Sequence, residues 1–211
     1  MRPSRWMGLL LAQGVLLACD VTGPDRGDTY GFRLQPQNVV FSWPADRLPV
    51  RYYAQPVGAL QDFVRGGIDL WESQFLYGEF SGALIDDSTS ADVRVVVDGG
   101  ALPSAPLTSA PPVAACDGRT VTSLTTDNRL SVPVVVHLRW FSGFAASDVV
   151  NCLSRVTAHE IGHTLGLLQH STQAGDLMFA VPAVTAPSAR DHSTVEVLYH
   201  TKPDVRPSPR P

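Results

Sequence analysis

One twelve-residue stretch, from His159 to His170, constrains this chain more than any other part of its sequence. On a helix, His159 and His163 lie four residues apart, so their imidazoles project from one face about one turn apart. Two neutral imidazoles at that separation can share a zinc ion, and the adjacent Glu160 can reach a water on the metal without binding the metal itself. Gly166 can adopt a positive φ. The stretch therefore predicts a metal-binding helix that ends near Gly166.

The third ligand of this site is expected to come from the chain that follows Gly166. His170 is the candidate, because a turn at Gly166 could bring it back to the metal. Gln169 comes one residue earlier, and an amide is a poor zinc ligand beside an imidazole. Three protein ligands would leave a fourth position for water, which is the catalytic arrangement of zinc. If the site lacks a third histidine, Asp176 and His192 are the alternatives.

The N-terminal residues have the character of an export signal. Arg2 and Arg5 precede an apolar run of 13 residues at 6–18, a length that suits a signal peptide better than a membrane-spanning helix. The run ends in Leu-Leu-Ala-Cys at 16–19, which resembles the bacterial lipoprotein signal. In such signals the chain is cut before the cysteine, and the thiol is lipidated. We expect lipidation at Cys19, with a plain secretory signal as the alternative.

The cysteine count agrees with export. The chain has three cysteines, and if Cys19 carries lipid then Cys116 and Cys152 remain as an even pair. An exported protein meets oxidising conditions in which disulfides persist. We therefore expect a Cys116–Cys152 disulfide, and the alternative is two buried free thiols.

Strand and helix patterns alternate along the rest of the chain. Short runs rich in β-branched and aromatic residues predict strands over 48–54, 92–97 and 132–140. Weaker patterns of the same kind predict two more strands, over 79–85 and 119–125. Apolar residues at steps of three and four predict an amphipathic helix over 57–77. Ser147 is the expected N-cap of the metal-binding helix. A last helix is predicted over 189–199, capped by Ser188.

Met178, eight residues after His170, adds a resemblance to a known family. Residues 176–178 resemble the methionine turn of the metzincin metalloproteases, and the chain is most similar to their matrixin-like bacterial members. The resemblance covers 147–179 and rests on His159, Glu160, His163, Gly166, His170 and Met178. In one respect the chain departs from the family, since the third metzincin histidine falls at the position of Gln169. The family fold would be α+β, a zincin-type catalytic domain with a twisted, mostly parallel sheet, an active-site helix, a methionine turn and a C-terminal helix.

The resemblance implies a zinc-dependent endopeptidase with one catalytic Zn²⁺ and a peptide or protein substrate. Glu160 would accept a proton from the water that attacks the peptide carbonyl and pass it to the leaving amine. Met178 would form an apolar floor beneath the histidines. An edge strand near 119–124 could hold the substrate in extended form, and 179–187 would form a pocket wall with an apolar preference. The alternative function is a non-catalytic metzincin-like lipoprotein that binds protein or metal.

These expectations divide the chain into a signal peptide, a lipidated tether, a catalytic domain and a proline-rich disordered tail, at 1–18, 19–37, 38–200 and 201–211. Residues 99–112 are rich in Pro, Ala and Ser and predict a long irregular loop. The formal net charge is −4 and no basic run exceeds a pair, so nothing indicates nucleic-acid binding. We expect an exported cell-envelope lipoprotein, held to a membrane by its lipid on the periplasmic or extracellular face, or a secreted protein if Cys19 is not lipidated.

Overall fold

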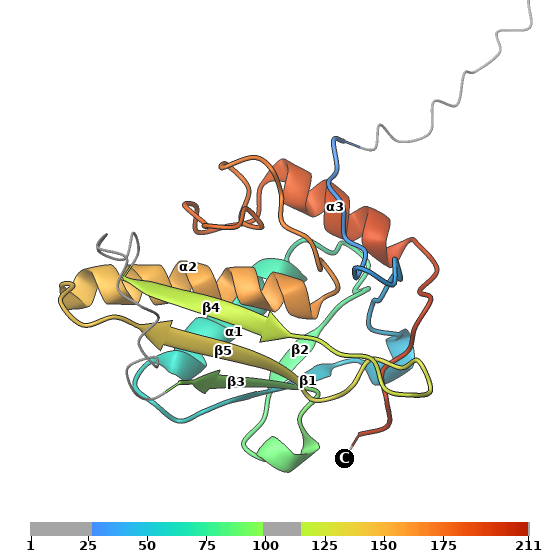
Figure 1. Cartoon of the computed structure of the whole chain (residues 1–211), viewed down its shortest axis with the longest axis horizontal. Helices are drawn as coiled ribbons and strands as arrows, with labels where there is room; N and C mark the ends of the chain where they lie inside the picture. Colours follow the sequence, from blue (N-terminus) through green and yellow to red (C-terminus); the bar gives the residue numbers. More distant parts are fainter. Residues whose placement is uncertain (1–26, 99–114, 211) are drawn as a thin grey trace, which may run out of the picture.

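The computed structural model describes residues 27–98 and 115–210, and is built on one five-stranded sheet. Its strand order is β2-β1-β3-β5-β4 (Figure 1). The strands are β1 (Val50–Ala54), β2 (Gly82–Leu84), β3 (Val93–Val97), β4 (Cys116–Val121) and β5 (Val134–Trp140). All neighbours pair in parallel except β4, which runs antiparallel to β5 at the edge. The predicted mostly parallel sheet is confirmed. The signal peptide, Cys19 and the expected loop at 99–112 lie outside the described residues.

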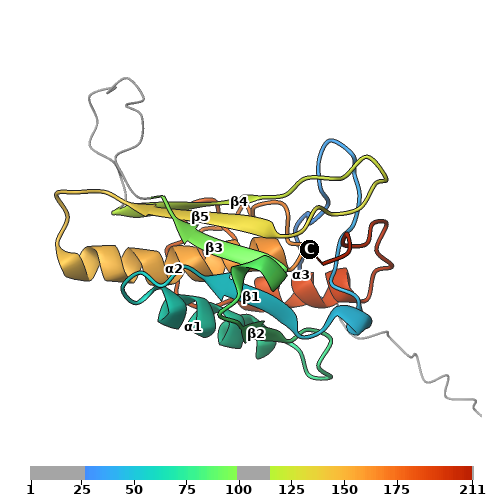
Figure 2. The same cartoon turned by 90° about the horizontal axis from the view of Figure 1, so that it is seen from below.

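Three α-helices accompany the sheet: α1 (Leu60–Glu72), α2 (Ala146–Thr164) and α3 (Ala189–Tyr199). Figures 1 and 2 show α1 and α2 side by side on one face of the sheet, with α3 beyond the C-terminal end of α2. Two short 3-10 helices occupy Ala45–Arg47 and Ser88–Ser90. No helix within 27–98 or 115–210 has the length and apolar character needed to cross a membrane.

The core lies between the sheet and the pair α1 and α2. Residues alternate between buried and partly exposed along β1, β3 and β5, so each of these strands presents one apolar face to the helices. Gly67 lets the two helices approach closely, because a Cβ there would lie 3.3 Å from the Cα of Ala158. The Trp71 indole N–H donates to the Ala158 carbonyl at 2.8 Å. These contacts hold α2 at a defined position over the sheet.

The structure differs from the expected tether and tail. Tyr30 is buried and its hydroxyl donates to Asp191 Oδ1 at 2.7 Å, and the Phe32 and Arg33 carbonyls accept from residues 168 and 169, so residues 30–33 contact the domain. At the other end, Val205 is 2% exposed and Arg210 forms an ion pair with the buried Asp92 at 2.8 Å. The prediction of a disordered tail over 201–211 is therefore wrong for residues 201–210. Composition alone indicated disorder, because it does not register the distant partners that order this segment.

Candidate metal centre

The end of α2 determines where the third histidine can lie. The helix stops at Thr164, and Gly166 has a φ of 111°, in the region that favours glycine. A Cβ on Gly166 would clash with the carbonyl oxygen of Phe41. A glycine is thus required both by the turn and by the close approach of the segment that contains Phe41. The segment that follows this turn brings His170 next to the two histidines of α2.

Three histidines converge beside α2. The possible ligand nitrogens of His159, His163 and His170 all lie within 4.8 Å of one another. Nε2 of His163 is 3.2 Å from Nε2 of His170. Tetrahedral zinc with Zn–N bonds of 2.0–2.1 Å holds its nitrogens about 3.3 Å apart, so this spacing fits a shared zinc ion.

The ring orientations of the first two histidines also suit a metal. Nδ1 of His159 is 2.7 Å from the Leu177 carbonyl oxygen, and Nδ1 of His163 meets the Leu167 carbonyl oxygen. Because a carbonyl only accepts, each Nδ1 must carry the proton, which leaves each Nε2 with a free lone pair. Burial lowers the pKa of His159 to about 4 and that of His163 to about 3. Burial also lowers the pKa of His170. Neutral imidazoles are the form that binds zinc, so the donor set fits this metal.

The other candidates for metal ligands lie apart from this cluster. Gln169 Nε2 donates to the Arg33 carbonyl at 2.9 Å. Asp176 accepts from the Ser188 hydroxyl at 2.7 Å and from a second serine. His192 is on α3, with its Nε2 3.9 Å from a Glu196 carboxylate oxygen. Within the described residues, the structure therefore groups His170 with the two helix histidines and leaves Gln169, Asp176 and His192 outside the group.

Glu160 is enclosed between α2 and the edge strand β4. Its side chain is buried, and the Thr120 hydroxyl donates to Glu160 Oε2 at 2.6 Å. A Cβ on Gly118 would lie 2.8 Å from Glu160 Oε1, so this glycine leaves room for the carboxylate. Burial raises the pKa of Glu160 to about 7, against the opposing effect of the Thr120 hydrogen bond. Sequence reasoning did not identify Gly118 or Thr120, because nothing local indicates which face of β4 meets α2.

Met178 lies directly beneath the metal-binding helix. It is fully buried, and a Cβ on Gly162 would clash with its sulfur. Asp191, on α3, anchors this turn by accepting from the backbone N–H of Leu177 at 2.7 Å and that of Met178 at 3.3 Å. Asp191 also completes a capping box with Ser188. The spacing of Ser188 and Asp191 was the one sequence signal that could have drawn attention to this carboxylate.

An open cleft of about 660 Å³ runs beside the histidines. Its lining comes from β4, from the exposed side of α2 and from the segment 180–183 that follows the methionine turn. Glu160, His159 and His170 all reach this cleft. Cys116 and Cys152 form a disulfide with their Cα atoms 5.8 Å apart, and both residues line the cleft. A peptide could therefore approach the histidines and the buried carboxylate from solvent.

One comparison with known proteins, a family model, agrees with this architecture. Residues 122–200, which include α2, the three histidines, the methionine turn and α3, match the family model described as Matrixin. No curated protein sequence matches the chain. Among solved structures, the chain is distantly similar to high choriolytic enzyme 1, a hatching enzyme zinc-protease from the medaka fish Oryzias latipes, with 11% identity, coverage of 82% of this chain and 100% of that chain, and a TM-score of 0.45. The α+β, matrixin-like metzincin fold expected from the sequence is confirmed.

Proposed function

We propose that this matrixin-like chain is a zinc-dependent endopeptidase with one catalytic Zn²⁺ held by His159, His163 and His170. The observation that carries the proposal is the convergence of three neutral imidazoles within 4.8 Å beside a buried carboxylate. The cleft that contains them is large enough for several residues of a peptide. Zinc bound there would supply a Lewis acid that polarises a peptide carbonyl and activates water.

Glu160 is the proposed general base and acid. Its pKa near 7 suits a group that must take a proton from the attacking water and then release it to the leaving amine at neutral pH. The Thr120 hydroxyl, 2.6 Å away, holds the carboxylate in one orientation. Met178 packs under the helix that carries His159 and His163, and would keep this helix in place while a peptide binds.

The edge strand β4 is the proposed support for the substrate backbone. Only β5 pairs with it in the described sheet, so the backbone groups along its other edge can bind an extended peptide. The same strand carries Gly118 and Thr120, which contact Glu160. A peptide paired with β4 would therefore pass close to the carboxylate.

A non-catalytic metzincin-like lipoprotein that binds protein or metal is the competing function. Such a protein would not need a carboxylate at residue 160, whereas here Glu160 is buried, hydrogen bonded and next in the chain to His159 of the histidine cluster. These contacts favour the enzyme. Burial also disfavours the ionised form of Glu160, so a buried carboxylate at this position lowers stability unless it has a function.

Export and anchoring through Cys19 remain part of the proposal. They are supported by the signal-like residues 1–19 and by the Cys116–Cys152 disulfide, which suits an oxidising compartment. A Cys19→Ala variant should move from the membrane fraction to the soluble fraction. Equal partitioning of the variant and the wild type would contradict lipidation.

The test of catalysis compares the wild type with Glu160→Gln on a mixed peptide library, with zinc content measured for both proteins. We expect Glu160→Gln to keep its zinc and to lose cleavage by about 10²-fold or more, because general acid–base catalysis is removed. Glu196→Gln, at an exposed position on α3, is the matched control and should cleave like the wild type. Equal cleavage by the wild type and Glu160→Gln would contradict the proposed endopeptidase function.

A further inference from the structure

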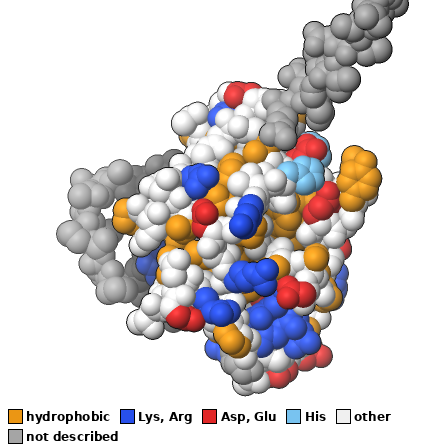
Figure 3. Space-filling model, turned by 90° about the vertical axis from the view of Figure 1, so that its right-hand side faces the viewer, with side chains coloured by type: hydrophobic (Ala, Val, Ile, Leu, Met, Phe, Trp, Pro, Cys, Tyr) orange, Lys and Arg blue, Asp and Glu red, His pale blue; other side chains and the backbone are white. Residues whose placement is uncertain are grey.

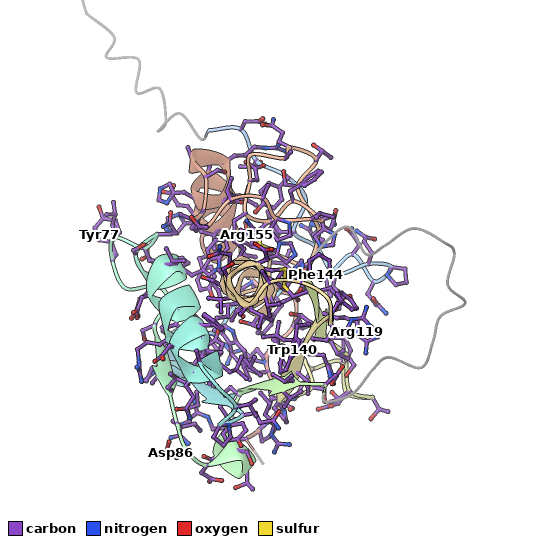
Figure 4. The ribbon with its side chains drawn as sticks, turned by 90° about the vertical axis from the view of Figure 1, so that its left-hand side faces the viewer. Tyr77, Asp86, Arg119, Trp140, Phe144 and Arg155 are labelled. Atoms are coloured by element: carbon purple, nitrogen blue, oxygen red, sulfur yellow. A yellow bond between two sulfur atoms is a disulfide. The ribbon has the colours of Figure 1, made fainter. Side chains whose placement is uncertain are left out.

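The cleft contains a cation that the proposed mechanism does not use. Arg155 is on α2 four residues before His159, so both side chains project from the same face of the helix. Figure 4, which looks along α2, shows Arg155 on the side of the helix that faces the segment before α3. Among the described residues that line the cleft, Arg155 is the single lysine or arginine.

The guanidinium of Arg155 lacks an acceptor in the described part of the chain. Its Nε is buried, and the N–H group there has no acceptor within hydrogen-bond distance. None of the ion pairs between described residues includes Arg155. An N–H group that is buried without an acceptor costs free energy, which a ligand with a suitable oxygen can recover. Arg155 is therefore available to an anion that enters the cleft.

The carboxylates near Arg155 are not placed to neutralise it. Asp117 lines the cleft but is paired with Arg139 of the neighbouring strand. Asp148 lies seven residues before Arg155, which is about 10 Å along the helix axis. Glu160 is bound by Thr120. Within the described residues no acid is therefore paired with Arg155, and this residue lines the cleft.

The position of Arg155 along the cleft indicates which substrate residue it meets. The leaving amine belongs to the residue that follows the scissile bond, and Glu160 must lie close to this amine to protonate it. Val156 and Arg155 lie about one turn before Glu160 on α2 and line the same cleft, which residues 180–183 also line, so the cleft offers a path from Glu160 along α2 to Arg155. A side chain on the residue after the scissile bond would extend along this path towards Arg155.

We propose that Arg155 binds the carboxylate of an aspartate or glutamate side chain on the substrate residue that follows the scissile bond. A guanidinium can bind a carboxylate through two parallel hydrogen bonds, which gives both strength and direction. Val156, Val181 and Pro182 would contact the aliphatic part of the same side chain. This selectivity replaces the apolar preference expected from the sequence, and it rests on the proposed endopeptidase function.

The test uses four peptides that differ only after the scissile bond, where they carry Glu, Gln, Leu or Lys. The zinc-loaded wild type should cleave the Glu peptide about 10- to 100-fold faster than the Gln peptide in kcat/KM, as expected for hydrogen bonds to a charged group. Arg155→Met should bring this Glu/Gln ratio close to one. Arg155→Glu should favour the Lys peptide over the Glu peptide, a reversal that a folding defect cannot produce.

Arg65→Met is the matched control, because it removes an arginine that is 62% exposed on α1, outside the cleft lining. It should keep the wild-type Glu/Gln ratio. An unchanged ratio in Arg155→Met, or a wild-type ratio near one while Glu160→Gln still abolishes cleavage, would overturn the assignment of Arg155 alone. Cleavage of none of the four peptides or of the mixed library by the wild type would overturn the endopeptidase function and this inference with it.

Discussion

At the scale of single residues, the metal centre depends on a turn that is one residue longer than the metzincin pattern. Gly166 reverses the chain with a positive φ, and the next segment leads Gln169 to the Arg33 carbonyl, away from the histidines. His170 then faces His163, with their Nε2 atoms 3.2 Å apart. The extra residue is therefore accommodated by the hydrogen bond of Gln169, and the third imidazole still reaches the cluster.

Replacement of these two neighbours should separate their roles. We expect His170→Ala to weaken zinc binding by more than about 100-fold, because loss of a direct ligand exceeds the effect of an outer-shell change. Gln169→Ala should weaken it by less than about tenfold, since Gln169 acts through the turn. Competition with a chelator measures both affinities. A larger loss for Gln169→Ala than for His170→Ala would overturn the ligand assignment.

At the scale of elements, the edge strand β4 joins the sheet to the metal-binding helix. It pairs only with β5 in the described sheet, contacts Glu160 through Gly118 and Thr120, and is bonded to α2 by the Cys116–Cys152 disulfide. An edge strand lacks a second neighbour to hold it in place. The disulfide therefore supplies a constraint at one end of the strand that also shapes the cleft.

Removal of this disulfide should lower the free energy of unfolding. The bridge closes a loop with a sequence separation of 36 residues, for which the loop-entropy model gives about 4 kcal/mol. We expect Cys116→Ala/Cys152→Ala to lose about this free energy of unfolding in urea. A reducing agent should destabilise the wild type and leave the double variant unchanged. Equal stability of the oxidised wild type and the double variant would contradict a structural role for the bridge.

At the scale of the whole molecule, both described ends of the chain pack against the folded domain. Tyr30 is bonded to Asp191, the residue that anchors the methionine turn. At the C-terminal end, Arg210 pairs with Asp92, which is fully buried and also bound by Arg47. Burial alone would raise the pKa of Asp92, but hydrogen bonds from Arg210 and its other partners lower it below the ordinary value.

The two arginines of the C-terminal segment provide a matched test. Arg210→Met should reduce the free energy of unfolding by about 1–3 kcal/mol at pH 7, because the buried Asp92 loses a charged partner. Arg206 is exposed and lines a surface hollow with Arg47 and Arg129, so Arg206→Met should change the free energy of unfolding by less than about 0.5 kcal/mol. Figure 3 shows that basic side chains gather on one face of the molecule.

The effect of Arg210→Met should depend on pH in one direction. Since the pKa of Asp92 is lower in the folded chain than in the unfolded chain, its ion pair stabilises the fold above the unfolded pKa near 4. This stabilisation is lost as the pH falls through the folded pKa. The difference between Arg210→Met and the wild type should therefore shrink on acidification below about pH 4. Urea unfolding at pH 7 and pH 3 measures this difference. Equal stability of the wild type, Arg210→Met and Arg206→Met at pH 7 would mean that the Arg210–Asp92 ion pair does not hold the C-terminal segment.

Several features follow from the sequence because their causes lie within a few residues of one another. His159, Glu160 and His163 share a helix face through their spacing alone, and Gly166 ends that helix through its own backbone freedom. Ser188 caps α3 by bonding to N–H groups two and three residues later, and α3 begins and ends where the sequence predicts. Runs of β-branched and aromatic residues likewise predict β1, β3 and β5, since this signal comes from neighbouring residues.

Other features were decided only by the tertiary structure, because their partners are far apart in the chain. Thr120 meets Glu160 across 40 residues, and Arg210 meets Asp92 across 118. No local pattern encodes such a pair, so the ordered C-terminal segment was mistaken for a disordered tail. The sequence already favoured His170 over Gln169 as a ligand, but only the structure shows that the Arg33 carbonyl, 136 residues from Gln169, holds this amide away from the histidines. The sequence by itself thus determined the chemistry of the helix, and the packing of distant segments decided which neighbours complete the site and which cation its cleft presents.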